Sequence, residues 1–240
     1  MSIWGKISGA AAGLITGGPV GALLGAIAGH FLVDRDEEND GDANIAFTIA
    51  VIALSAKMAK ADGIVTDDEV EAFERLFRVP PEEVANVRRV FDMARRDTAG
   101  YEAYAGQIAR MFAGNPALLE DILDGLFEIA KADGVLHPAE AAFLERVAEI
   151  FGFAPNEFRR IRASHFAPDK ADPYVVLGIA YDASDEEVRR TYRRLVKENH
   201  PDSLIGRGVP PEFVRLATDK LSAINVAYDK IEIERGLKAS

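Results

Sequence analysis

The sequence predicts an all-α protein with an amino-terminal membrane helix, a central helical bundle and a carboxy-terminal helical hairpin. Three observations predict this class. Residues 7–33 carry no Lys, Arg, Asp or Glu, a segment near residue 62 recurs 71 positions later, and residues 184–228 space apolar side chains three and four apart. That spacing is typical of helices packed on one face, and the alternation that marks strands is almost absent.

Composition excludes several classes of protein. The 240 residues carry a formal net charge of −11 and no Cys. The missing Cys excludes a disulfide-stapled scaffold, a thiolate zinc site and a cysteine nucleophile. The acidic balance disfavours broad electrostatic capture of nucleic acid, which needs basic surface to displace counterions. The length suits one or two globular domains with real cores.

The first predicted element is a membrane helix over residues 1–33. Its uncharged run of 27 residues would extend about 40 Å as a helix, enough for a hydrocarbon core of about 30 Å. Small residues at every fourth position let two such helices approach closely in lipid, so the same segment predicts a homodimer. The glycines assigned to this helix packing are Gly9, Gly13, Gly17, Gly21, Gly25 and Gly29.

Other interpretations of this segment remain open. The run is too long for the apolar part of a secretory signal. A flexible Gly- and Ala-rich leader would fit the composition, as would two short segments broken at Gly17-Gly18-Pro19, since proline removes a backbone donor. Lys6 and the amino terminus are positive before the segment, and Arg35 follows it among acidic residues. The Lys/Arg rule is close to a tie and does not choose an orientation.

A duplicated helical unit follows the acidic linker 34–44. Ala59-Lys60-Ala61-Asp62-Gly63 recurs as Ala130-Lys131-Ala132-Asp133-Gly134, and Glu69 corresponds to Glu140. The repeat predicts two related helix–turn–helix units packed together over residues 45–164. Gly63 and Gly134 suit left-handed helix ends, and Asn115-Pro116 and Pro138 suit helix starts.

The repeated Lys-Ala-Asp-Gly with a Glu seven residues after the Asp resembles the TerB-like domain of tellurite-resistance proteins. The resemblance implies a divalent metal bound by Asp62, Glu69, Asp133 and Glu140. Carboxylate oxygens are the ligands that hard divalent cations prefer. The alternative is that each Asp closes a turn and each Glu caps a helix, which their spacing explains without a metal.

The carboxy-terminal part, residues 172–240 after a linker at 165–171, carries the most specific pattern. A short helix ends at Gly178, and Ser184 with acidic residues behind it begins a longer helix that reaches about Asn199. One face of that helix is apolar, through Val188, Tyr192, Leu195 and Val196. The opposite face is basic, through Arg189, Arg190, Arg193, Arg194 and Lys197. A stripe of one sign in so acidic a chain indicates a recognition surface, since a merely solvated face more often mixes signs.

His200-Pro201-Asp202 follows in a predicted loop, and Pro210-Pro211 precede a last helix with Phe213, Ile224 and Tyr228 at helical spacing. Preceded by YRRLVKEN, the tripeptide resembles the J domain, the DnaJ-type module that activates DnaK-type heat-shock chaperones. The three parts together resemble the DjlA-like group of membrane-anchored DnaJ-like proteins. Ser203 departs from the Lys found in many J domains, and the chain lacks the Gly/Phe-rich linker and zinc module of full DnaJ.

The resemblance implies a co-chaperone and not an enzyme. The basic residues would dock on an acidic surface of the ATPase, and His200, Pro201 and Asp202 would activate its ATP hydrolysis. The implied partners are a DnaK-type chaperone, client proteins and the lipid bilayer, with no nucleic acid. The implied location is the bacterial inner membrane, with one membrane span and the soluble domains facing the cytoplasm.

Two other functions stay open. One is a membrane-tethered, metal-responsive stress sensor whose TerB-like domain binds the ligand. The other is a hydrolase with His200 or His137 as general base, which the absence of Gly-x-Ser-x-Gly and His-Glu-x-x-His motifs disfavours.

Overall fold

The computed structural model shows an all-α chain. The residues that it describes are 47–48, 50–58, 71, 74, 79, 81, 84–85, 88, 100–131, 135–165, 172–206, 209 and 214–237. Within these ranges every regular element is a helix, which confirms the predicted fold class. The six glycines assigned to helix packing lie outside the described residues, as do Gly63, Asp62, Glu69, Asp133, Gly134 and Phe213.

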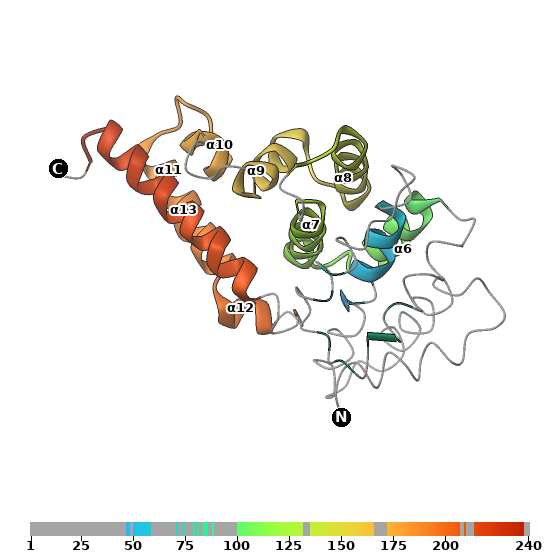
Figure 1. Cartoon of the computed structure of the whole chain (residues 1–240). Helices are drawn as coiled ribbons and strands as arrows, with labels where there is room; N and C mark the ends of the chain where they lie inside the picture. The colour runs from blue at the N-terminus through green and yellow to red at the C-terminus, as the bar shows by residue number, and fades with distance from the viewer. Residues whose placement is uncertain are drawn as a thin grey trace.

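Four helices of the middle unit are described from end to end (Figure 1). They are α6 (Tyr101–Met111), α7 (Pro116–Ala130), α8 (Pro138–Phe151) and α9 (Pro155–His165). The predicted starts at Asn115-Pro116 and Pro138 are confirmed. The Asn115 side chain accepts a hydrogen bond from the Leu118 amide at 3.2 Å, which satisfies one of the amides left open at a helix start.

The core of the middle unit surrounds α7. This helix buries Leu119, Ile122, Leu126 and Phe127. Residues 50–58, also helical, are buried throughout, and their apolar side chains belong to the same buried cluster. A helix that is apolar on most sides has to lie in the interior of its unit, so α7 is in contact with both α8 and α9.

The carboxy-terminal unit consists of α10 (Pro173–Leu177), α11 (Asp185–Glu198), α12 (Pro201–Ile205) and α13 (Val214–Glu234). The predicted end of the first helix at Gly178 is confirmed, since Gly178 is left-handed with φ 68°. The predicted start at Ser184 is also confirmed, because its hydroxyl accepts from the Glu187 amide at 3.2 Å.

α11 and α13 form the predicted hairpin. Val188 and Leu195 of α11 share a buried cluster with Ile224 and Ala227 of α13. The rings of Tyr192 and Tyr228 stack between them with centroids 3.9 Å apart. The long α13 runs along α10, α11 and α12 and contacts all three helices (Figure 1).

The prediction of a loop at His200-Pro201-Asp202 is wrong in one respect. His200 is the residue before α12, and Pro201 and Asp202 form its first turn. Proline has no amide hydrogen and a φ already suited to a helix, so it favours the first helical position. The tripeptide is therefore a helix start with a fixed backbone.

Candidate functional site

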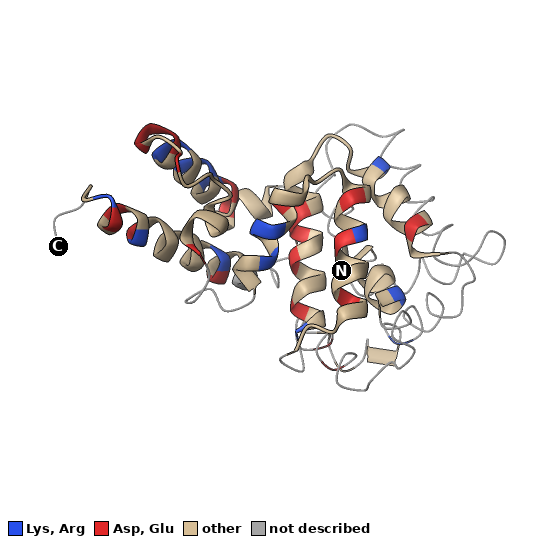
Figure 2. Cartoon of the chain, turned by 90° about the horizontal axis from the view of Figure 1, so that it is seen from above, with Lys and Arg blue, Asp and Glu red and all other residues tan. Residues whose placement is uncertain are grey.

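The candidate site is where α11 ends and α12 begins. The α11 helix carries the five predicted basic residues, Arg189, Arg190, Arg193, Arg194 and Lys197, and all five are exposed. In Figure 2 acidic residues lie at the first turn of α11 and basic residues follow along it. The structure thus brings together on one helix face the cations that the sequence placed there.

His200 has a defined orientation at the start of α12. Its Nδ1 accepts a hydrogen bond from the Asp202 amide at 3.3 Å. The neutral ring then carries its proton on Nε2, where it can be donated to another molecule. The side chains of His200 and Asp202 are 52% and 89% exposed, so both are open to a partner.

Hydrogen bonds at the end of α11 fix the position of α12. The Asn199 side chain is buried and donates to the Leu195 carbonyl at 2.8 Å, which closes the helix end. The Ser203 hydroxyl donates to the Lys197 carbonyl at 2.7 Å. Ser203, which stands where many J domains have Lys, therefore ties α12 to the last turn of α11.

A second His-Pro dipeptide provides an internal comparison. His137 and Pro138 begin α8 as His200 and Pro201 begin α12. At α8 the His137 amide donates to the Glu140 carboxylate at 2.9 Å. The helix described before this dipeptide, α7, has no basic residue in its last turn. Both histidines are thus extended residues before a helix that begins with Pro. His200 differs from His137 in its position beside the basic face of α11.

The residues predicted to hold a metal are described only in part. Glu140 is buried and caps α8 through its bond to the His137 amide. That is the capping role weighed as the alternative to metal binding. Within the described ranges no group of three or more His, Asp or Glu side chains is arranged to hold a metal ion.

A cluster of buried charges that the sequence analysis did not single out lies between the two units. It consists of Glu120, Asp124 and Glu128 on α7, Arg160 and His165 on α9, and Lys220 on α13, and we call it the interdomain ion cluster. The acids recur every fourth residue, which places them on one face of a helix. Nothing in the sequence indicated that a cation from residue 220 would cover that face.

A cleft of about 430 Å³ opens beside this cluster. Glu120, Asp121 and Glu157 border it from the middle unit, and Arg194 and Glu198 border it from α11. Arg194 is paired with Glu198 at 2.8 Å and remains 54% exposed. Of the five basic residues on α11, Arg194 is the one that borders the cleft.

Three family models match the chain. The co-chaperone DjlA transmembrane domain matches residues 1–46, the tellurite resistance protein TerB matches residues 48–163, and the DnaJ domain matches residues 172–233. The middle unit is accordingly called the TerB-like domain below, and the carboxy-terminal unit the J domain. The first match indicates that the chain is anchored in a membrane. In the described part of the chain, no helix combines the length and apolar character that a membrane span needs.

Curated relatives match the chain over nearly its whole length. Co-chaperone protein DjlA of Photobacterium profundum is 30% identical over 277 residues, which cover 98% of this chain and 100% of the relative. Co-chaperone protein DjlA of Coxiella burnetii is 28% identical, with 97% of this chain and 98% of the relative covered. The protein of the same name from Photorhabdus laumondii is 27% identical. No solved structure matches the chain.

Proposed function

Because the chain belongs to the DjlA family of co-chaperones, we propose that it stimulates ATP hydrolysis by a DnaK-type chaperone through His200, Pro201 and Asp202. The observation that carries this proposal is the exposed His200 and Asp202 at a helix start directly after five exposed cations on α11. No other cluster of described residues combines a basic face with an exposed tripeptide of this kind.

Docking begins with the basic face of α11. Five exposed cations without an acid among residues 188–197 create a local positive potential in a chain of net charge −11. Opposite potentials increase the rate of encounter and select the orientation in which two proteins meet. An acidic surface on the ATPase would therefore align along α11.

Activation then belongs to the first turn of α12. Pro201 fixes the backbone, and the bond from the Asp202 amide to Nδ1 fixes the His200 ring. Because the His200 donor and the nearby Asp202 carboxylate have a fixed backbone, they lose little entropy when they contact a partner. If they contact one conformation of the partner better than another, they favour that conformation. A differential contact of this kind is sufficient to shift the ATPase toward its hydrolysis-competent state.

The same proposal gives the location and the orientation. Residues 1–33 would anchor the chain in the bacterial inner membrane by one span, and the glycine stripe would allow two copies to pair. A partner that hydrolyses cytoplasmic ATP requires the TerB-like domain and the J domain to face the cytoplasm. Client proteins would be bound by the activated chaperone, since the chain has no zinc module of its own.

The test is the ATP turnover of a DnaK-type chaperone with the full chain in detergent micelles. We expect His200→Gln to reduce stimulation to the basal rate, because Gln replaces the rigid ring at an exposed position where the fold does not depend on it. The matched control is His137→Gln, which changes the same dipeptide at the start of α8 and should leave stimulation intact. Full stimulation by the folded His200→Gln protein would refute the role of the tripeptide.

A further inference from the structure

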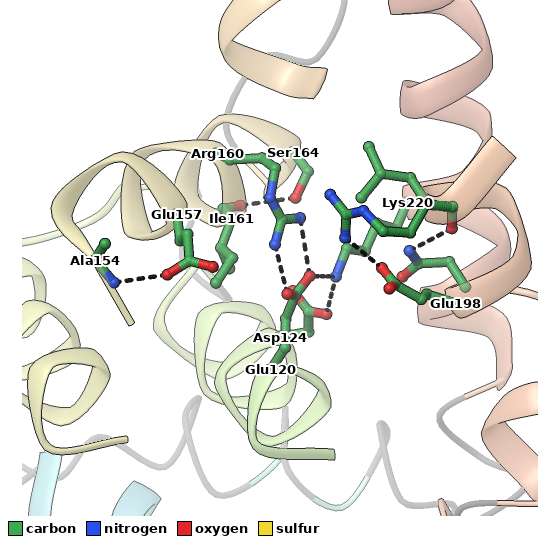
Figure 3. A network of polar contacts seen from close by, with 12 residues as sticks. Glu120, Asp124, Ala154, Glu157, Arg160, Ile161, Ser164, Glu198 and Lys220 are labelled. Carbon is green, nitrogen blue, oxygen red and sulfur yellow. Dashed lines mark hydrogen bonds and ion pairs between the residues drawn. The ribbon is translucent and has the colours of Figure 1, made fainter. Parts of the chain in front are cut away.

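The contact between the TerB-like domain and the J domain centres on two acids of α7. Figure 3 shows Arg160 from α9 and Lys220 from α13 meeting at Glu120 and Asp124. Lys220 Nζ donates to Asp124 Oδ2 at 2.7 Å and also to Glu120. Arg160 donates to both carboxylate oxygens of Glu120, through Nη1 at 2.9 Å and through Nη2.

These charges are removed from water. The side chains of Lys220 and Asp124 are 5% and 7% exposed. A buried charge is costly unless it is paired and hydrogen-bonded, and removing one partner leaves the other uncompensated. Lys220 belongs to the J domain, and its acceptors Glu120 and Asp124 belong to the TerB-like domain. The buried charge of Lys220 is therefore compensated by the other domain.

The pKa values agree with charged Glu120, Arg160 and Lys220 at the centre of the cluster. Burial by itself would raise the pKa of Glu120, but Lys220 and Arg160 outweigh it and hold that pKa well below its usual range. Burial would lower the pKa of Lys220, but Asp124 and Glu120 raise it. The ion pairs therefore persist throughout the neutral range.

Close packing surrounds the ion pairs. Gly178 of the J domain lies against the aliphatic part of Arg160, and a Cβ added at Gly178 would lie 2.8 Å from Arg160 Cδ. Three residues of the J domain belong to the same buried cluster as the core of the TerB-like domain: Leu204 in α12, Ala217 in α13, and Val209 between these helices. The contact therefore has an apolar part beside its ionic part, and it includes the helix that begins with Pro201.

We propose that the acidic face of α7 is a docking surface for this chain's own J domain, locked by Lys220, and that the two domains move as one body. Linked domains usually move relative to each other, and the buried ion pairs would prevent that motion here. The TerB-like domain would then hold the J domain in one orientation, which fixes the direction of α11 and α12. We call the TerB-like domain in this role the holder. In the docked arrangement the basic residues of α11, including Arg194 beside the cleft, and the side chain of His200 remain exposed. The face that we assign to partner binding therefore stays accessible.

Distance measurements on the full chain in detergent micelles test this directly. The sequence has no Cys, so Glu145→Cys on α8 and Glu186→Cys on α11 introduce the two spin-label sites, both exposed. The labelled chain is diluted into an excess of unlabelled chain so that pairs of copies contribute no distance, and pulsed electron–electron double resonance should then give a single narrow distance between the two labels of one copy. Lys220→Glu opposes Glu120 and Asp124 with a third negative charge, and we expect the narrow distance to be lost.

The matched control is Lys230→Glu, which makes the same charge change on the same helix outside the interdomain ion cluster. It should keep the narrow distance. Lys220→Met, which removes the charge and keeps the aliphatic stem, should broaden the distribution even if Lys220→Glu impairs folding, with far-ultraviolet circular dichroism as the check on helix content. A narrow distance retained in folded Lys220→Met, or a broad one in the unaltered chain, would overturn the lock. No chaperone is present in this measurement, so its outcome is independent of the proposed ATPase stimulation.

Discussion

His165 is the buried titratable residue of the interdomain ion cluster. Its Nε2 lies 2.7 Å from Asp124 and its Nδ1 3.0 Å from Glu128, and its ring stacks on Phe127 at 5.1 Å. Burial by itself would lower the pKa of His165, but the hydrogen bonds to both carboxylates outweigh it and raise that pKa above its ordinary 6.5. The protonated imidazolium can donate to both carboxylates at once, whereas the neutral ring can donate to only one of them.

Stability should consequently decrease as the pH rises. Because the pKa of His165 is higher in the folded than in the unfolded state, its protonation stabilises the folded state. This stabilisation is complete at pH values below the unfolded-state pKa and is lost as the pH rises through the folded-state pKa. Each unit of difference between the two pKa values corresponds to about 1.4 kcal/mol. Urea unfolding of the full chain should show higher stability at pH 6 than at pH 8, and His165→Gln should flatten this dependence. The control variant His137→Gln should keep the difference in stability between pH 6 and pH 8. If the His165→Gln protein kept the same difference as the unaltered chain, His165 would not be its source.

Ser203 follows the His-Pro-Asp tripeptide directly and joins α12 to the last turn of α11. Its hydroxyl bond to the Lys197 carbonyl is local, so Ser203→Ala should lower the free energy of unfolding by about 1 kcal/mol. Ser203→Lys should lose the same bond and add a cation beside α11, which should speed association with the ATPase at low salt. Thermal melts and stopped-flow association measure the two effects, and a Ser203→Lys protein that associates no faster would show that the site is outside the docking face.

At the scale of elements, one face of α11 packs against the rest of the J domain and the opposite face is exposed to solvent. Its apolar face stacks on α13 through Tyr192 and Tyr228, whereas its basic face is exposed. Because the two faces share no residue, charge on one can be changed without removing the packing of the other. α11 is therefore the element on which electrostatic steering can be tested in a folded protein.

Reversing Arg193 and Arg194 to Glu should reduce the association rate with the ATPase by about tenfold or more at low salt, and should weaken its dependence on salt. The control reverses Arg159 and Arg162, two exposed residues of α9 in the TerB-like domain. That control makes the same change in net charge and should associate normally. If both double variants slowed equally, net charge and not the face of α11 would govern the encounter.

At the scale of the whole molecule, we propose that the chain consists of a membrane anchor, a TerB-like domain that orients the J domain, and the J domain that activates the ATPase. The anchor is predicted to be residues 1–33, within the segment matched by the DjlA transmembrane model. Removing these residues should release the protein into the supernatant of carbonate-washed membranes, whereas the full chain should stay in the pellet. The His200→Gln chain is the control and should also stay in the pellet. A full chain recovered in the supernatant would contradict the anchor.

The sequence by itself determined the features that depend on near neighbours. Helix starts at Asn115-Pro116, Pro138 and Ser184, and the helix end at Gly178, were predictable because capping bonds join residues two to five positions apart. The basic face of α11 was predictable because helical spacing fixes which side chains share a face. The loop predicted at His200 was wrong because proline both interrupts and begins helices, and only the backbone distinguishes these cases.

The tertiary structure decided which charges meet. Lys220 and Asp124 are 96 positions apart, and any Lys can attract any Asp, so no sequence spacing marks their pair. Burial makes the pair specific, since the packing of α9 against both α7 and α13 helps to exclude the water that would otherwise solvate both ions. The proposed contact between the domains thus depends on how they pack, whereas His200-Pro201-Asp202, to which we assign activation, could be found in the sequence alone.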